Sequence, residues 1–115
     1  MKERITVIVP CYNEQEAFPV FYRELCRVME EMKDCEFEVI GVNDGSEDDT
    51  LSVLKELAEK DDRVRYVSLS RNFGKEAAIY AGLEYSSGDY VVIMDADLQD
   101  PPELLPGMLS AVREE

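Results

Sequence analysis

Residues 5–10 read Ile-Thr-Val-Ile-Val-Pro, a run of β-branched side chains that ends abruptly at a proline. Such a run, without the alternation of a half-exposed strand, predicts a strand buried on both faces, as in a parallel sheet. From residue 14 to residue 33, apolar side chains recur every three or four positions, which predicts a helix with one buried face. The chain is therefore predicted to begin with a strand followed by a helix.

The same strand-then-helix unit recurs three times downstream. We predict strands over residues 37–42, 64–69 and 89–94, and helices over residues 46–60, 74–86 and 101–113. Ser46 is expected to cap the second helix, with the acidic residues 47–49 in its first turn. Asp100 is expected to cap the last helix, with Pro101 in the first turn and Glu103 three residues after the cap. Four alternating units predict an α/β fold with a mainly parallel four-stranded sheet flanked by helices.

Composition excludes several classes of function. The 115 residues are 45% hydrophobic and 33% charged, which is typical of one globular domain. A net charge of -14 disfavours a nucleic-acid partner or an anionic membrane surface. Three cysteines without metal-ligand spacing, and no histidine, disfavour a disulfide framework and a zinc site. No apolar run approaches the roughly 18 residues of a membrane span, so we expect the chain as given to be cytoplasmic.

Ligands of an open parallel sheet bind beyond the carboxyl ends of its strands, so the loops after the predicted strands hold the candidate site. Asp95 and Asp97 follow the last strand, and residues two apart in extended chain point the same way. Two adjacent carboxylates favour a hard cation such as Mg²⁺ or Mn²⁺, and Gln99 supplies a further oxygen. In so acidic a chain an Asp-x-Asp pair is more often a solvated surface feature, but the strand end raises the weight of a metal site.

Two further loops have both a structural and a functional interpretation. Asp44 precedes Gly45 and Ser46, which form a turn and a helix cap, yet a carboxylate at a strand end can also accept the N–H of a nucleobase. Tyr12 offers an aromatic face on which a base can stack. Glu14 in the same loop, taken alone, is more simply explained as the start of a helix.

The loop after the third strand supplies cations to a chain that has few. Arg71 and Lys75 are candidates for contacting a diphosphate, although Arg71 is more simply explained as a solvated loop charge. The segment lacks the Gly-x-x-x-x-Gly-Lys-Ser/Thr pattern of a P-loop.

Four motifs taken together resemble glycosyltransferase family 2. They are Ile-Val-Pro-Cys-Tyr-Asn-Glu at 8–14, Asn-Asp-Gly-Ser-Glu-Asp-Asp-Thr at 43–50, Arg-Asn-Phe-Gly-Lys at 71–75 and Met-Asp-Ala-Asp-Leu-Gln-Asp-Pro-Pro-Glu at 94–103. Their order and spacing match across nearly the whole chain. The third motif and the end of the fourth resemble most the polyprenyl-phosphate branch, which includes dolichyl-phosphate mannose synthases and bacterial undecaprenyl-phosphate sugar transferases.

The resemblance implies a Rossmann-like nucleotide-sugar-binding fold of the GT-A type. It further implies a divalent metal, Mg²⁺ or Mn²⁺, and inverting transfer of a sugar from a UDP- or GDP-sugar to a polyprenyl phosphate. The residues it assigns to the nucleoside are Pro10, Tyr12, Glu14 and Ala96, with Asp44 on the base. The residues it assigns to the metal are Asp95, Asp97 and Gln99, and catalysis is assigned to both aspartates together with Lys75, which would contact a phosphate or the acceptor.

The chain departs from the family pattern in two ways. Asn43 stands where the family usually has the first Asp of Asp-Asp-Gly-Ser, but Asp44 keeps the second, so we expect nucleotide binding to survive. Family members also continue with further strands, so we interpret residues 1–115 as the N-terminal donor-binding portion of a longer enzyme, inactive alone. We expect the full-length enzyme at the cytoplasmic face of a membrane. Unpaired edges of the shortened sheet favour a homo-oligomer.

Two interpretations from other classes compete with this one. A receiver domain of a two-component system is similar in length, acidic and Mg²⁺-binding, but needs paired acids after its first strand and a phosphorylatable Asp after its third. Pro-Cys-Tyr-Asn and Ser-Arg stand at those places here, so the match is poor. The other is a noncatalytic nucleotide-binding module. Asp44 is compatible with uracil or guanine, and we favour UDP only slightly.

Overall fold

The structure is a computed structural model that describes residues 2–99 and 101–113. Its strands and helices alternate along the chain, which confirms the predicted α/β class. In chain order the elements are β1 (Glu3–Cys11), α1 (Ala17–Glu31), β2 (Cys35–Asp44), α2 (Thr50–Lys60), β3 (Val64–Leu69), α3 (Lys75–Tyr85), β4 (Tyr90–Ile93), the 3₁₀ turn η1 (Pro102–Leu104) and α4 (Leu105–Arg113).

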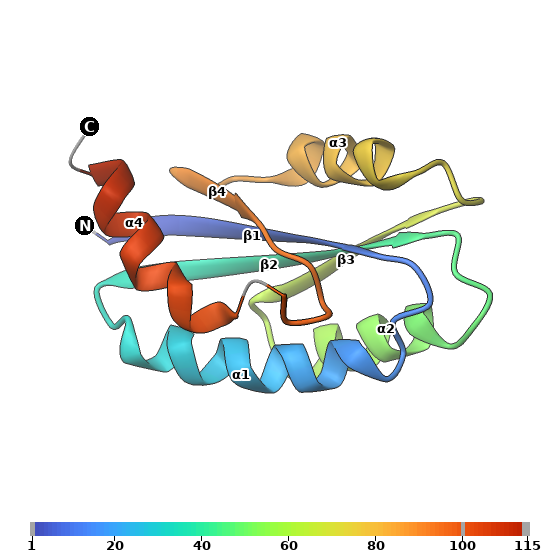
Figure 1. Ribbon diagram of the computed structural model, residues 1–115, viewed down its shortest axis with the longest axis horizontal. Coiled ribbons are helices and arrows are strands. Elements are labelled where there is room, and N and C mark those ends of the chain that lie inside the picture. The colour runs from blue at the N-terminus through green and yellow to red at the C-terminus, as the bar shows by residue number, and fades with distance from the viewer. Residues whose placement is uncertain (1, 100, 114–115) are drawn as a thin grey trace.

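All strand pairs described are parallel, and the strand order is β3-β2-β1-β4. The chain steps from β1 through β2 to β3 in one direction, then returns to pair β4 with the free side of β1. Right-handed crossovers place the helices of opposite steps on opposite faces of a sheet. Figure 1 shows this arrangement, with α1 and α2 below the sheet and α3 above it. The loops after β1 and β4 follow neighbouring strands, so both lie at the carboxyl edge of the sheet, where α/β folds bind ligands.

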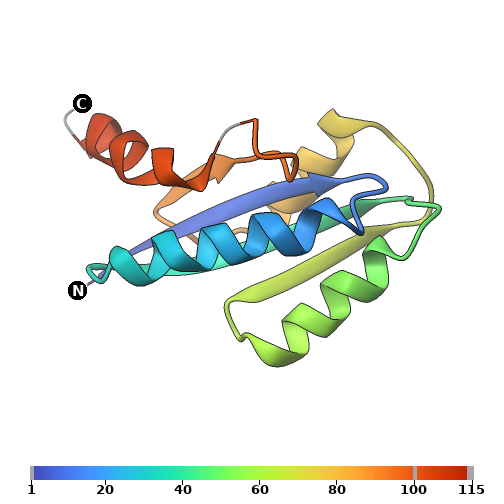
Figure 2. The same cartoon turned by 60° about the horizontal axis from the view of Figure 1, so that its bottom comes forward.

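The larger part of the core lies between the sheet and α1. Phe18, Phe21 and Leu25 project from α1 onto the β1 residues of that face, and all are fully buried. Figure 2 shows α1 and α2 side by side across this face of the sheet. On the other face α3 lies so close to β1 that a Cβ at Gly82 would come within 2.7 Å of Ile8. The absent side chain of Gly82 therefore sets how closely α3 approaches the sheet.

Two predicted helices begin later than their periodicity suggests. Helix α1 begins at Ala17 rather than at residue 14, and α2 begins at Thr50 rather than at Ser46. Ser46 does not cap α2, because its hydroxyl accepts the backbone N–H of Asn13, and Asp48 instead accepts the N–H of Thr50. The residues before α1 and α2 instead form hydrogen bonds between the loop after β1 and the loop after β2.

The last predicted helix is divided. Residues 102–104 form the 3₁₀ turn η1 and the α-helix proper begins at Leu105, while the predicted cap Asp100 lies outside the described residues. Pro101 has extended backbone with ψ 143°, so it precedes the helix instead of forming its first turn. Buried Leu105 and Leu109 connect α4 to the main core.

The prediction of burial on both faces, made for the first strand, is confirmed for β1. Strand β4 is less buried: Val91 and Ile93 are 39% and 43% exposed, since β4 is an edge strand and α3 lies over β1 and β2. Within the described part of the chain, no helix has the length and apolar character required to cross a membrane.

Candidate functional site

A cavity of about 420 Å³ opens at the carboxyl edge of the sheet, where the predicted loops meet. Its lining is contributed by β1 and the loop after it, the end of β2, the region from the β3–α3 loop to the start of α3, and the loop after β4. The lining residues are Pro10, Cys11, Tyr12, Glu14, Asp44, Asn72, Gly74, Lys75, Asp95 and Asp97. Of the residues that the family resemblance assigns to the site, all line this cavity except Ala96 and Gln99. Arg71, the other cation considered for a diphosphate, does not line it.

The two exceptions have clear structural reasons. Ala96 is 2% exposed and packs in the main core, so almost none of this residue is accessible from the cavity. The side chain of Gln99 is exposed and does not line the cavity, while its backbone N–H donates to Asp97 Oδ1 at 3.1 Å. Of the three predicted metal ligands, Asp95 and Asp97 therefore line the cavity and Gln99 does not.

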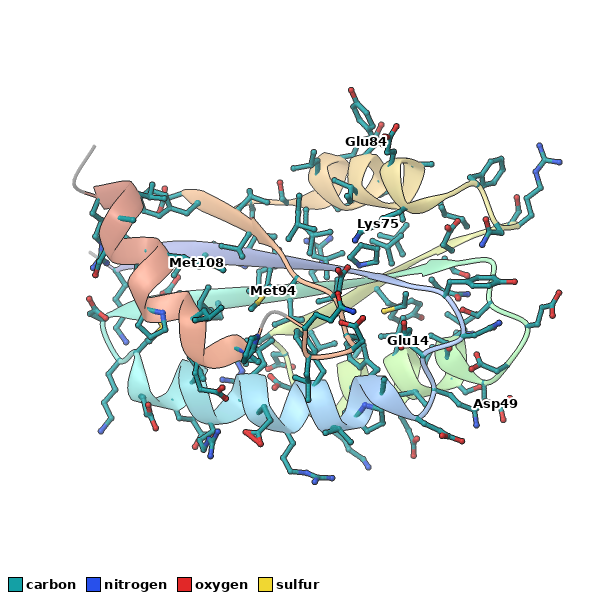
Figure 3. The ribbon with its side chains drawn as sticks, in the orientation of Figure 1. Glu14, Asp49, Lys75, Glu84, Met94 and Met108 are labelled. Carbon is teal, nitrogen blue, oxygen red and sulfur yellow. The ribbon has the colours of Figure 1, made fainter. Side chains whose placement is uncertain are left out.

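Lys75 and Asp95 form an ion pair across the cavity. Lys75 is the first residue of α3, and its Nζ lies 2.8 Å from Oδ1 and 3.0 Å from Oδ2 of Asp95. Figure 3 shows that Lys75 approaches from α3, above the sheet in this view, whereas Glu14 approaches from the side of α1. The sequence indicates both members of the pair as site residues, but it does not indicate that they bind each other.

Asp44 has a structural role that the sequence analysis missed. Its carboxylate is buried, and its two oxygens accept the backbone N–H groups of Phe73 at 2.8 Å and Gly74 at 3.1 Å. Gly45 has φ +65°, and a Cβ there would lie 2.2 Å from the backbone carbon of Arg71. Asp44 and Gly45 together hold the β3–α3 loop in place. Each carboxylate oxygen retains further acceptor capacity, so Asp44 can also accept the N–H of a nucleobase.

The loops after β1 and β2 are joined by reciprocal hydrogen bonds. Asn13 donates its backbone N–H to the Ser46 hydroxyl at 2.9 Å, and its side-chain oxygen accepts the N–H of Glu47 at 2.8 Å. Glu14 donates its N–H to the Thr50 hydroxyl at 2.8 Å. Asn13 has φ +55°, a left-handed conformation that asparagine tolerates. These bonds position Tyr12 and Glu14 at the cavity, and only the abundance of amide and hydroxyl side chains in both motifs hints at them.

Asn43, the residue that departs from the family pattern, forms hydrogen bonds through both the nitrogen and the oxygen of its side-chain amide. Its Nδ2 donates to the Ser68 hydroxyl at 3.1 Å, and its Oδ1 accepts the backbone N–H of Ser46 at 3.1 Å. An aspartate could accept from Ser46 but could not donate to Ser68. The asparagine also avoids a second buried carboxylate next to Asp44, which would be costly in free energy.

The cavity has a strongly negative electrostatic character. Burial raises the pKa of Glu14 above its usual value, and the charges of Asp97, Asp95 and Asp48 raise it further. Burial, followed by the charge of Glu14, raises the pKa of the Cys11 thiol far above neutral pH. Cys11 therefore stays protonated, donating to the Val9 carbonyl at 3.3 Å, and is not a nucleophile.

The donor set at the cavity suits a hard divalent cation that keeps part of its shell for other ligands. Among residues 2–99 and 101–113, no three His, Cys, Asp or Glu side chains are arranged to hold a metal ion. Asp95 and Asp97 nevertheless present carboxylate oxygens to one cavity. Mg²⁺ and similar ions bind through one or two carboxylates and complete their shell with water and substrate phosphates. The residues present fit such an ion, provided that Lys75 leaves Asp95.

Comparison with known proteins places these features in a family. The model of the family described as Glycosyl transferase family 2 matches residues 6–115. The bactoprenol glucosyl transferase of Shigella phage SfV is 47% identical over 106 residues, which cover 92% of this chain and 34% of that protein. This chain thus spans about a third of the length of the curated relatives it matches.

Two solved structures share the fold. The mannosyltransferase PcManGT from Pyrobaculum calidifontis, in complex with GDP-Man and Mn²⁺, has a TM-score of 0.72 at 30% identity, over 95% of this chain and 32% of that one. S. aureus TarS 1–349 in complex with UDP-GlcNAc has a TM-score of 0.71 at 26% identity, over 99% of this chain and 32% of that one. These matches confirm the predicted GT-A type of fold and remove the receiver-domain interpretation. The chain belongs to glycosyl transferase family 2.

Proposed function

We propose that residues 1–115 form the donor-binding portion of a longer enzyme that transfers a sugar from a nucleotide sugar to a polyprenyl phosphate. The observation that carries this proposal is the single cavity shared by Tyr12, Asp44 and the Asp95/Asp97 pair. The relative named bactoprenol glucosyl transferase supports the acceptor class, and the GDP-Man and UDP-GlcNAc complexes of similar proteins support the donor class. Because its acceptor is a lipid, the full enzyme would work at the cytoplasmic face of a membrane.

The nucleoside would occupy the side of the cavity nearest β1. Tyr12 is largely exposed and lines this side, so its ring is available for stacking on a base. Pro10 and Glu14 would form the walls around the ribose, and Asp44 would accept an N–H of uracil or guanine. Ala96, which the family resemblance assigns to the nucleoside, is 2% exposed, so it would contact the nucleoside only after the loop after β4 rearranges.

Asp95 and Asp97 would hold Mg²⁺ or Mn²⁺ together with the diphosphate, and Gln99 would reach that shell only after its side chain reorients. The bound ion would supply positive charge that stabilises the diphosphate as a leaving group. An ion at this place also explains how a chain with a net charge of -14 accommodates an anionic donor.

In the transfer step, a phosphate oxygen of the polyprenyl phosphate would attack the anomeric carbon of the donor sugar. The bond between that carbon and the diphosphate oxygen breaks, and its electron pair leaves with the nucleoside diphosphate, so the anomeric configuration is inverted. The acceptor phosphate is already ionised, so no general base is needed. The contribution of this chain is to orient the donor and, through the Lys75 ammonium, to stabilise charge on a phosphate.

The donor site is tested by titration calorimetry of the chain with UDP and with GDP, each with and without Mn²⁺. We expect one nucleotide to bind in a metal-dependent manner, and Asp97→Ala to abolish that binding. The matched control is Asp62→Ala, which removes an exposed carboxylate between α2 and β3, outside the cavity. Binding that is independent of Mn²⁺, or equal in Asp97→Ala and the parent chain, would refute the metal-assisted donor site.

Strand β4 lies at an exposed edge of the sheet. We propose that the chain self-associates through the edge strand β4, whose Val91 and Ile93 are exposed. Sedimentation equilibrium should then give a mass above that of one chain, and Ile93→Lys should restore the monomer. A monomeric mass of the parent chain at high concentration would contradict this.

A further inference from the structure

Asp95, a ligand of the proposed metal, forms an ion pair with Lys75. Nζ contacts both carboxylate oxygens, at 2.8 and 3.0 Å, so the ammonium sits where a cation bound to Asp95 would have to sit. The side chains of Lys75 and Asp95 are 58% and 33% exposed, so the pair is accessible to water and to ions. An ion pair this exposed is weak, and a divalent cation can displace it.

The surroundings explain why a cation is present at this point. The cavity lining contains the carboxylates of Glu14, Asp44, Asp95 and Asp97, and among its described residues Lys75 is the one cation. Asp95 and Asp97 already raise the pKa of Glu14, so the carboxylates interact with one another. The ammonium of Lys75 reduces this repulsion while no other cation is bound.

Lys75 can change partner without a change in the backbone. Asp44 holds the two residues before Lys75 through the N–H groups of Phe73 and Gly74, which fixes the start of α3. The lysine side chain is a flexible four-carbon stem, so its ammonium can turn from Asp95 to a neighbouring phosphate while its Cα stays in place.

We propose that Lys75 makes metal binding depend on the nucleotide, because its ammonium and the divalent cation are alternative partners of Asp95. Without nucleotide, Lys75 competes with the cation and weakens its binding. A bound diphosphate gives Lys75 a new partner and frees Asp95 for the metal, so nucleotide and metal strengthen each other's binding by the same factor. This inference rests on the proposed donor site and assigns Lys75 a regulatory role within it.

The test measures free Mn²⁺ by electron paramagnetic resonance during titration of the 115-residue chain without nucleotide. Lys75→Gln should bind Mn²⁺ about fivefold more tightly than the parent chain, which is the size of effect an exposed ion pair carries. Lys75→Arg keeps the charge and should bind Mn²⁺ like the parent chain. Lys55→Gln removes an equal charge from an exposed position of α2, outside the cavity, and should change the affinity by less than about twofold.

The same titration is repeated with saturating UDP and with saturating GDP. The nucleotide that binds should raise the Mn²⁺ affinity of the parent chain by a larger factor than that of Lys75→Gln. Equal or weaker Mn²⁺ binding by Lys75→Gln, with nucleotide enhancement intact in both proteins, would overturn the role of Lys75 and leave the donor site standing. If neither nucleotide enhanced Mn²⁺ binding in any of the proteins, the donor site and this inference would both be refuted.

Discussion

Carboxylates at the two ends of the sheet have pKa values shifted in opposite directions. At the amino end, Glu38 of β2 is almost fully buried and accepts hydrogen bonds from Thr6, from the N–H of Ser87 and from Arg65, at 2.8 to 2.9 Å. Burial alone would raise the pKa of Glu38, but these hydrogen bonds outweigh it and bring the pKa to about 2. At the carboxyl end, burial and the nearby Asp97 and Asp95 raise the pKa of Glu14.

The difference separates a structural carboxylate from a functional one. Donors from β1, β3 and the segment before β4 converge on Glu38, so its charge is satisfied within the protein and links these three segments to β2. At the carboxyl end the negative charges outnumber the one cation among the described cavity residues, so the cluster is left to attract a cation from outside. Unbalanced charge of this kind lowers stability and is retained where a ligand balances it.

Removing the carboxylate of Glu38 should have the largest effect on the stability of the chain. Glu38→Ala leaves Thr6 and the Ser87 N–H without their acceptor, so we expect the free energy of unfolding to fall by about 3 kcal/mol. Urea unfolding measures this, with Glu36→Ala, an exposed glutamate of the same strand, as a control that should cost less than about 0.5 kcal/mol. A similar small cost for both variants would show that Glu38 is not the structural carboxylate described here.

Asp44 lies at the carboxyl end of the sheet, but its carboxylate is hydrogen-bonded within the protein, as the carboxylate of Glu38 is. Asp44→Ala removes the acceptor for two backbone N–H groups, so we expect it to lower the free energy of unfolding by about 2 kcal/mol without any ligand present. The measurement is urea unfolding of the nucleotide-free chain. A residue that only bound a base would leave that stability unchanged, and such a result would remove the loop-holding role of Asp44.

The smallest expected effect is the pH dependence of stability. It has opposite signs for Glu14 at the carboxyl end of the sheet and for Glu38 at the amino end. Glu14 has a raised pKa, so its ionisation destabilises the folded state, and this cost develops as pH rises from its ordinary value of 4.5 through the raised value. We expect Glu14→Gln to stabilise the chain at pH 7 by less than about 1 kcal/mol, with no effect below that window. Unfolding in urea between pH 3 and pH 7 follows the difference, and a Glu14→Gln variant less stable than the parent at pH 7 would contradict it.

Glu38 provides the opposite pH dependence in the same experiment. Its pKa is lowered from 4.5 to about 2, so its stabilisation is complete above 4.5 and is lost as pH falls toward 2. The Glu38→Ala variant should therefore converge with the parent chain in strongly acidic solution. If the two proteins stayed equally far apart down to pH 2, the stabilisation would not come from the charge of Glu38.

Much of the site follows from the sequence, because its residues belong to short motifs at strand ends. Periodicity predicts each strand and helix, and parallel strands bring the loops after them to one edge, so Tyr12, Asp44, Asp95 and Asp97 are found together as predicted. The errors are local. Helices α1 and α2 begin late because the residues before them bond to each other's loops, which no pattern within one loop reveals.

The sequence by itself determined the alternating α/β order, the loops that carry the site and the family, because these depend on residue types and short spacings. Only the tertiary structure decided that β4 pairs with β1, that Asp44 holds the loop before α3, and that Lys75 binds Asp95. These contacts join residues 20 or more positions apart. They depend on strand order and side-chain direction, which are set by the packing of the whole chain and not by any one segment of it.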